Sequence, residues 1–95
     1  MTTKKAILIK VDGTVTDITT NKKPTLEELQ KLVGGFIEVV HNIPYMNRQA
    51  EMIVDEKGHC KYKPWNSIAT QLYHVNHITT HPIAGDVVIL IGWRF

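Results

Sequence analysis

The chain has 95 residues, a formal net charge of +2 and 43% hydrophobic residues, which suits one globular core and leaves no room for a second domain. The weak positive charge comes from dispersed lysines and does not by itself indicate nucleic-acid binding. The sequence has one cysteine, no long apolar run and no secretory start. We therefore expect a single α+β domain over residues 1–95, cytoplasmic and without a membrane partner.

Two β-rich runs open the chain, Ala6 to Val11 and Thr14 to Thr19. The dipeptide Asp12-Gly13 between them suits the positive φ angles of a tight hairpin turn. The two runs are therefore predicted to pair antiparallel.

A short helix with clear ends follows this hairpin. Thr25 and Glu28 stand at capping-box spacing, and the leucines and valine after them repeat along one helical face. Gly34-Gly35 supplies the left-handed backbone that ends a helix. The period then changes, so Phe36 to Val40 is predicted to be a strand.

The middle of the chain has less regular signals. Asn42 to Arg48 contains a proline and two asparagines, and it is expected to form an irregular rim or lid. Ala50 to Val54 and His59 to Tyr62 flank Asp55 to Gly58 in a pattern typical of a second hairpin.

The last third predicts a helix and a central strand. Asn66 can cap a helix that continues to about Val75, and Pro82 prevents its simple continuation. Val87 to Ile91 is a continuous apolar run, as expected of a strand buried on both faces. The predicted order is ββαβββαβ, in which two helices pack on a mixed sheet of about six strands.

The start of the second helix is the leading candidate for a ligand site. Free backbone N–H groups at a helix start attract anions, and Trp65 offers an aromatic plane beside Asn66 and Ser67. Thr70 and His74 lie one and two turns further along the same face, while Glu38 is a carboxylate within an apolar strand and needs a partner, water or a pocket. The predicted ligand-binding residues are Glu38, Trp65, Asn66, Ser67, Thr70 and His74, and a nucleotide-type ligand is expected there.

The segment Lys57 to Trp65 supports an alternative function. Lys57, Lys61 and Lys63 interleave with Tyr62 and Trp65, a composition typical of surfaces that bind single-stranded nucleic acid. An ordinary solvated hairpin predicts the same alternation. This segment therefore suggests a nucleic-acid-binding regulator as the second hypothesis.

A metal site or a small hydrolase is the third hypothesis. His74, His77 and His81 lie close together in the sequence, and Cys60 could join them as a zinc ligand or act as a nucleophile with one of them. Polar residues at a fraying helix end and a buried small cysteine explain the same residues more simply. We therefore expect no cofactor, no metal and no catalytic residue.

Four separated fragments together resemble one protein family. They are Leu29 to Gly35 followed by Phe36 to Val40, then Ile53 to Gly58, Asn66 to Thr70 and Ile83 to Val88. Their order is similar to that of the uncharacterised family called domain of unknown function 3846. The resemblance covers nearly the whole chain and implies a phage-like context, in which small proteins often bind and block host components.

These observations lead to one functional hypothesis. The chain is expected to be a non-enzymatic accessory protein of a phage or mobile element, and a homo-oligomer. It is expected to sequester a nucleotide-type signal or a host defence protein, in the cytoplasm of the host.

Overall fold

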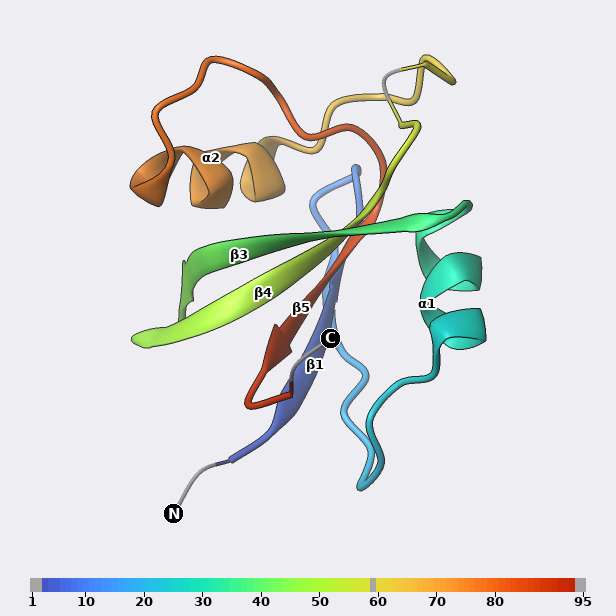
Figure 1. Cartoon of the computed structure of the whole chain (residues 1–95), viewed down its shortest axis with the longest axis vertical. Coiled ribbons are helices and arrows are strands. Elements are labelled where there is room, and N and C mark those ends of the chain that lie inside the picture. Colours follow the sequence, from blue (N-terminus) through green and yellow to red (C-terminus); the bar gives the residue numbers. More distant parts are fainter. Residues whose placement is uncertain (1–2, 59, 94–95) are drawn as a thin grey trace.

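The computed structural model describes residues 3–58 and 60–93. Its elements follow in the order ββαββαβ, with the two helices on different sides of a twisted sheet (Figure 1). The elements are β1 (Lys5–Ile9), β2 (Val15–Asp17), α1 (Leu26–Val33), β3 (Ile37–Tyr45), β4 (Arg48–Asp55), α2 (Ser67–Asn76) and β5 (Val87–Ile91). Within the described ranges, neither helix is long and apolar enough to cross a membrane.

The α+β class is confirmed, but the predicted sheet is wrong in two respects. The sheet has five strands in the order β2-β1-β5-β4-β3. Each neighbouring pair is antiparallel, so the sheet is not mixed. The strand β5 lies between β1 and β4 and is buried along its whole length, which confirms the central position that its apolar run predicted.

The missing sixth strand is the one expected at His59 to Tyr62. His59 lies outside the described residues, and the residues after it form a turn. Tyr62 has a φ of 57°, which is left-handed backbone and incompatible with a strand. The residues after His59 therefore do not form a strand, although their sequence was typical of one half of a hairpin.

The second hairpin joins β3 and β4. Its turn lies at Met46 and Asn47, before the predicted turn at Asp55 to Gly58. Met46 and Asn47 form its two-residue connection with φ angles of 52° and 59°, the signs that a type I′ turn requires. Pro44 lies within β3, an edge strand, where a missing N–H is tolerated. The segment expected to be an irregular rim or lid is therefore mostly strand.

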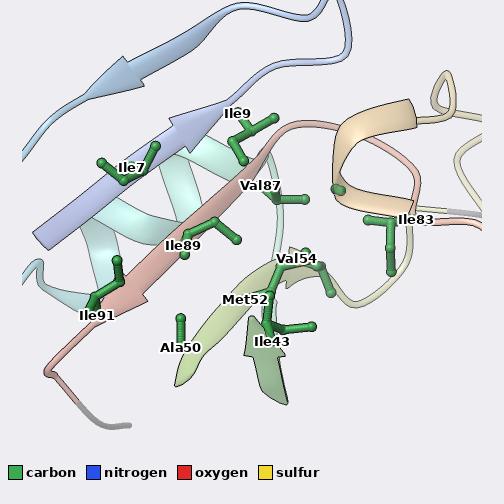
Figure 2. Packing of buried hydrophobic residues seen from close by; sticks show 11 residues of the cluster. Ile7, Ile9, Ile43, Ala50, Met52, Val54, Ile83, Val87, Ile89 and Ile91 are labelled. Carbon is green, nitrogen blue, oxygen red and sulfur yellow. The ribbon is translucent and has the colours of Figure 1, made fainter. Parts of the chain in front are cut away.

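The sheet buries a separate cluster of side chains on each face. One cluster joins alternate residues of the strands to Ala69 of α2 and to Ile83, which lies in the segment after α2 (Figure 2). The other joins the intervening strand residues to Leu29 and Val33 of α1. The two helices therefore cover opposite faces, because β5 and its neighbours offer apolar side chains in both directions.

The caps of α1 confirm the sequence signals. Thr25 and Glu28 form both hydrogen bonds of the capping box, and Gly34 ends the helix with a φ of 80°. Two lysines that lie after β4 in the sequence donate hydrogen bonds to this end of the helix. Lys61 Nζ donates to the carbonyl of Gly34 at 3.0 Å, and Lys63 Nζ donates to the carbonyl of Val33 at 2.6 Å. Cations are favourable there, because the helix dipole is negative at its C-terminus.

Both lysines also pair with Asp55, the last residue of β4. Asp55 Oδ2 lies 2.9 Å from Lys61 Nζ and 2.6 Å from Lys63 Nζ, and its side chain is fully buried. Its other oxygen accepts a hydrogen bond from the backbone N–H of Lys57 at 2.8 Å. We call Asp55, Lys61 and Lys63 the Asp55 clasp. It joins the end of β4, the loop after it and the end of α1.

Gly35 is the residue that lets the clasp close. A Cβ atom at this position would lie 2.8 Å from Asp55 Oδ1 and would also meet Lys61 Nζ. Distances this short are not found between real Cβ atoms and their neighbours. The second glycine of the pair therefore does more than end a helix, since it leaves the space in which the carboxylate and the ammonium group meet.

The Asp55 clasp predicts an acid-dependent loss of stability. Burial raises the pKa of Asp55, but hydrogen bonds from Lys63, Lys61 and Lys57 outweigh this effect and lower it from 3.8 to about 2. The folded state therefore binds this proton less readily than the unfolded state, so the stabilisation is complete above about pH 4 and is lost as the pH falls to 2. It corresponds to about 2 kcal/mol.

Urea unfolding at pH 5, 4, 3 and 2 measures this contribution. The free energy of unfolding of the wild type should fall by about 2 kcal/mol more than that of the Asp55→Asn variant over this range. Parallel pH profiles for the two proteins would show that the clasp does not perturb the pKa of Asp55.

Candidate functional site

Asn66, the centre of the predicted ligand site, is a buried structural residue. Its side chain is used completely: Nδ2 donates to the carbonyls of Ile9 and Gly85 at 2.9 and 3.0 Å, and Oδ1 accepts from the N–H of Ala69 at 3.1 Å. Its backbone N–H donates to the carbonyl of Ile83 at 2.7 Å. Asn66 therefore caps α2, as predicted, and joins this helix to β1 and to the segment before β5.

Thr70 and His74 hold the segment that returns from α2 to the sheet. Thr70 Oγ1 accepts from the N–H of Ile83 at 2.9 Å, and His74 Nε2 lies 2.8 Å from the carbonyl oxygen of His81. The hydroxyl group of Thr70 and the imidazole ring of His74 therefore both contact backbone groups of the chain. These two residues therefore position the segment 81–84 against α2.

Trp65 and Ser67 are exposed on either side of Asn66. Trp65 forms an isolated antiparallel bridge with Ala84, and 69% of its surface is exposed. The five predicted residues from Trp65 to His74 are thus close in sequence, but none of them lines the cavity described below. Asn66, Thr70 and His74 make contacts that hold the fold together, whereas Trp65 and Ser67 are exposed at the surface.

A cavity of about 150 Å³ lies beside them, between the sheet and the segment after α2. We call it the Glu38–Glu56 groove. Its walls come from β3, from the end of β4, from α2 and from the return segment. They are formed by Glu38, Val40, Val54, Asp55, Glu56, Tyr73, His81, Pro82, Ile83 and Ala84. Of the six predicted site residues, Glu38 lines this groove.

The carboxylates of Glu38 and Glu56 give the groove its charge. Glu38 is paired in register with Val54, and the N–H of Glu56 donates to the carbonyl of Phe36 at 2.9 Å. This diagonal arrangement across two strands separates the two Cβ atoms by roughly 7 Å. Neither carboxylate has a hydrogen bond or ion pair within residues 3–58 and 60–93. The charge of Asp55, in contrast, is compensated by its two lysines.

The lysines of the expected nucleic-acid hairpin do not form one surface. The ammonium groups of Lys61 and Lys63 contact Asp55, although the side chain of Lys61 is 42% exposed. Lys57 and Tyr62 are exposed as well. Because the ammonium groups of Lys61 and Lys63 already contact a carboxylate and a helix end, they are poorly placed to bind phosphates. The contacts of these two lysines hold the loop against Asp55 and the end of α1.

Two histidines of the metal hypothesis contact backbone carbonyls. His77 Nδ1 lies 3.0 Å from the carbonyl oxygen of Tyr73, and His74 contacts the carbonyl of His81. In the described ranges, no three histidine, cysteine, aspartate or glutamate residues are grouped to hold a metal ion. Cys60 is exposed, so the expectation that it is a buried small side chain was wrong.

Comparison with known families tests the family resemblance that the four sequence fragments indicated. The model of a family described as a domain of unknown function, DUF3846, matches residues 3–92. The chain belongs to the DUF3846 family. No curated protein and no solved structure matches it. The DUF3846 description carries no activity, so the function of this member has to be argued from its own residues.

Sequence reasoning about this DUF3846 protein missed Glu56, Tyr73 and the return segment as parts of a site. Glu56 was assigned to a turn, and Tyr73 lay within the helix predicted to continue to about Val75. One signal was available, since Glu38 and Glu56 share a face once β3 and β4 are paired through Met46 and Asn47. The wrong position of the second hairpin concealed it.

The role of Asn66 gives a direct prediction. The Asn66→Ala variant loses three buried hydrogen bonds, those with the carbonyls of Ile9 and Gly85 and with the N–H of Ala69, so its free energy of unfolding should fall by about 3 kcal/mol. The neighbouring Ser67→Ala change removes an exposed hydroxyl and should cost less than about 0.5 kcal/mol. Urea unfolding followed by circular dichroism measures both. Equal losses would mean that Asn66 is not the buried connection described above.

Proposed function

We propose that this DUF3846 protein acts by binding rather than by catalysis, and that it sequesters its target through the Glu38–Glu56 groove. The observation that supports the proposal most strongly is a pair of carboxylates at the wall of a formed cavity, neither of which has a partner among the described residues. Carboxylates accept hydrogen bonds and gain from opposite charge. Two of them on one face of a sheet repel each other weakly, so a bound group that neutralises both would stabilise the folded protein.

The biological context is part of the same proposal. We infer that the protein is an accessory protein of a phage or mobile element that blocks a host defence component, as a homo-oligomer in the host cytoplasm. The support for this inference is the phage-like context that the resemblance to DUF3846 implies.

The geometry favours a host protein over a nucleotide-type signal as the target. Phosphate groups carry negative charge, and the carboxylates of Glu38 and Glu56 would repel them. A base could still donate N–H groups to a carboxylate if its phosphates lay outside the groove. The nucleotide hypothesis therefore stays a prediction, and it is tested together with the leading one.

The other two hypotheses receive less support. For nucleic-acid binding, the lysine segment contributes Lys57 as an exposed cation, whereas the ammonium groups of Lys61 and Lys63 contact Asp55. For a metal-dependent or Cys/His hydrolase, the contacts of His74 and His77 with carbonyls occupy one ring nitrogen of each. We therefore place the function at the groove.

Thermal unfolding in the presence of small probes tests whether the groove binds. The panel consists of cyclic and linear nucleotides and the amides of acetylated cationic, neutral and acidic amino acids, each at millimolar concentration. A probe at ten times its Kd stabilises the folded state by about 1.4 kcal/mol, which raises the Tm of a domain of this size by several degrees.

The rise in Tm should be absent from the Glu38→Gln/Glu56→Gln variant and retained by Glu27→Gln, which removes an exposed carboxylate from α1. A shift that persists in the groove variant would place the binding site elsewhere. If no probe of any class raises the Tm, the groove is not a binding site for these ligands and the proposal fails.

A further inference from the structure

The carboxylates of Glu38 and Glu56, which have no partner within residues 3–58 and 60–93, lie where a single planar cation could contact both. Glu38 and Glu56 lie on the face of the sheet that α2 covers, diagonal to each other across β3 and β4. A guanidinium group offers five N–H donors in one plane and can meet a carboxylate with two parallel hydrogen bonds. An ammonium group offers three donors from one point and spans such a gap less well.

The remaining walls of the groove suit the same group. Tyr73 contributes an aromatic ring from α2, and Pro82 and Val40 contribute apolar surface. Guanidinium groups stack on aromatic rings and are weakly hydrated, so they enter such surroundings more easily than ammonium groups. The cavity, at about 150 Å³, has room for one long side chain rather than for a folded segment.

The surface around the groove indicates that the cation belongs to a protein. Phe36 shares a backbone hydrogen bond with Glu56, and Trp65 is bridged to Ala84 in the wall. Their exposed fractions are 71% and 69%. Aromatic residues beside a charged pocket are typical of protein interfaces, in which they cover the chain on both sides of an anchoring residue. A free cation would make no use of them.

We propose that the Glu38–Glu56 groove binds an arginine side chain presented by an extended segment of a partner protein, with its guanidinium between the two carboxylates and against Tyr73. The flanking residues of the segment lie on Phe36 and Trp65. This inference rests on the proposed function, because it names the class of target that the binding site takes.

Titration of ¹⁵N-labelled protein, followed by NMR, tests the inference. The probes are acetyl-Gly-Arg-Gly-amide, acetyl-Leu-Arg-Leu-amide and acetyl-Leu-citrulline-Leu-amide, in which citrulline keeps the shape of arginine and lacks its charge. Spermidine serves as a free cation and cyclic and linear nucleotides as anions. The arginine peptides should shift the amide signals of Glu38, Glu56 and Tyr73.

The expected affinities follow from the geometry. The citrulline peptide should bind at least tenfold more weakly than its arginine counterpart, and the Leu-flanked peptide should bind several-fold more tightly than the Gly-flanked one. The Glu38→Gln/Glu56→Gln variant should lose at least tenfold in affinity, while Glu27→Gln should bind like the wild type. The citrulline comparison uses the unmodified protein and therefore does not depend on the folding of a variant.

Each contrary result has a separate meaning. Equal binding of arginine and citrulline peptides, or spermidine binding as tightly as the Leu-flanked peptide, would overturn the arginine inference. If nucleotides shift the groove signals and arginine peptides do not, the inference fails while the binding function stands. If no probe shifts these signals, both fail.

Discussion

The buried carboxylate of Asp55 is the constraint on which the arrangement of the loops depends. It stands at the end of β4 and pairs with two lysines that also hold the C-terminus of α1. A buried charge is costly unless it is paired and hydrogen-bonded, so the loop carrying Lys61 and Lys63 has to fold back over α1. That return fixes where the chain enters α2, and Asn66 then connects the start of this helix to β1 and to the segment before β5.

The sequence predicted those elements whose signals are local. The capping box at Thr25, the glycine stop at Gly34 and the cap at Asn66 need only neighbouring residues, and the apolar run of β5 indicated its central position. The β3–β4 turn was missed because Met46 and Asn47 do not resemble a typical turn dipeptide. Lysines paired with a distant Asp55 look the same in a sequence as lysines on a solvated strand, so their structural role needs the fold.

The candidate site shows the same division between local and distant information. Residues near the start of α2 have polar groups that suggested a ligand, yet Asn66, Thr70 and His74 satisfy those groups within the chain. The carboxylates of Glu38 and Glu56 are distant in sequence and come together through the pairing of β3 with β4. Polar groups that already form hydrogen bonds within the fold have few free donors or acceptors for a ligand. Carboxylates beside a cavity that have no partner among the described residues can still bind one.

The central claim is that the scaffold satisfies its own buried polar groups and leaves the two groove carboxylates for a partner. The most direct measurement is the free energy of unfolding of the Glu38→Gln/Glu56→Gln variant in urea, without any ligand. Exposed carboxylates without partners contribute little to folding, so the variant should match the wild type within about 0.5 kcal/mol or exceed it. A loss of more than about 1 kcal/mol would contradict the account, because it would mean that these carboxylates hold the fold together.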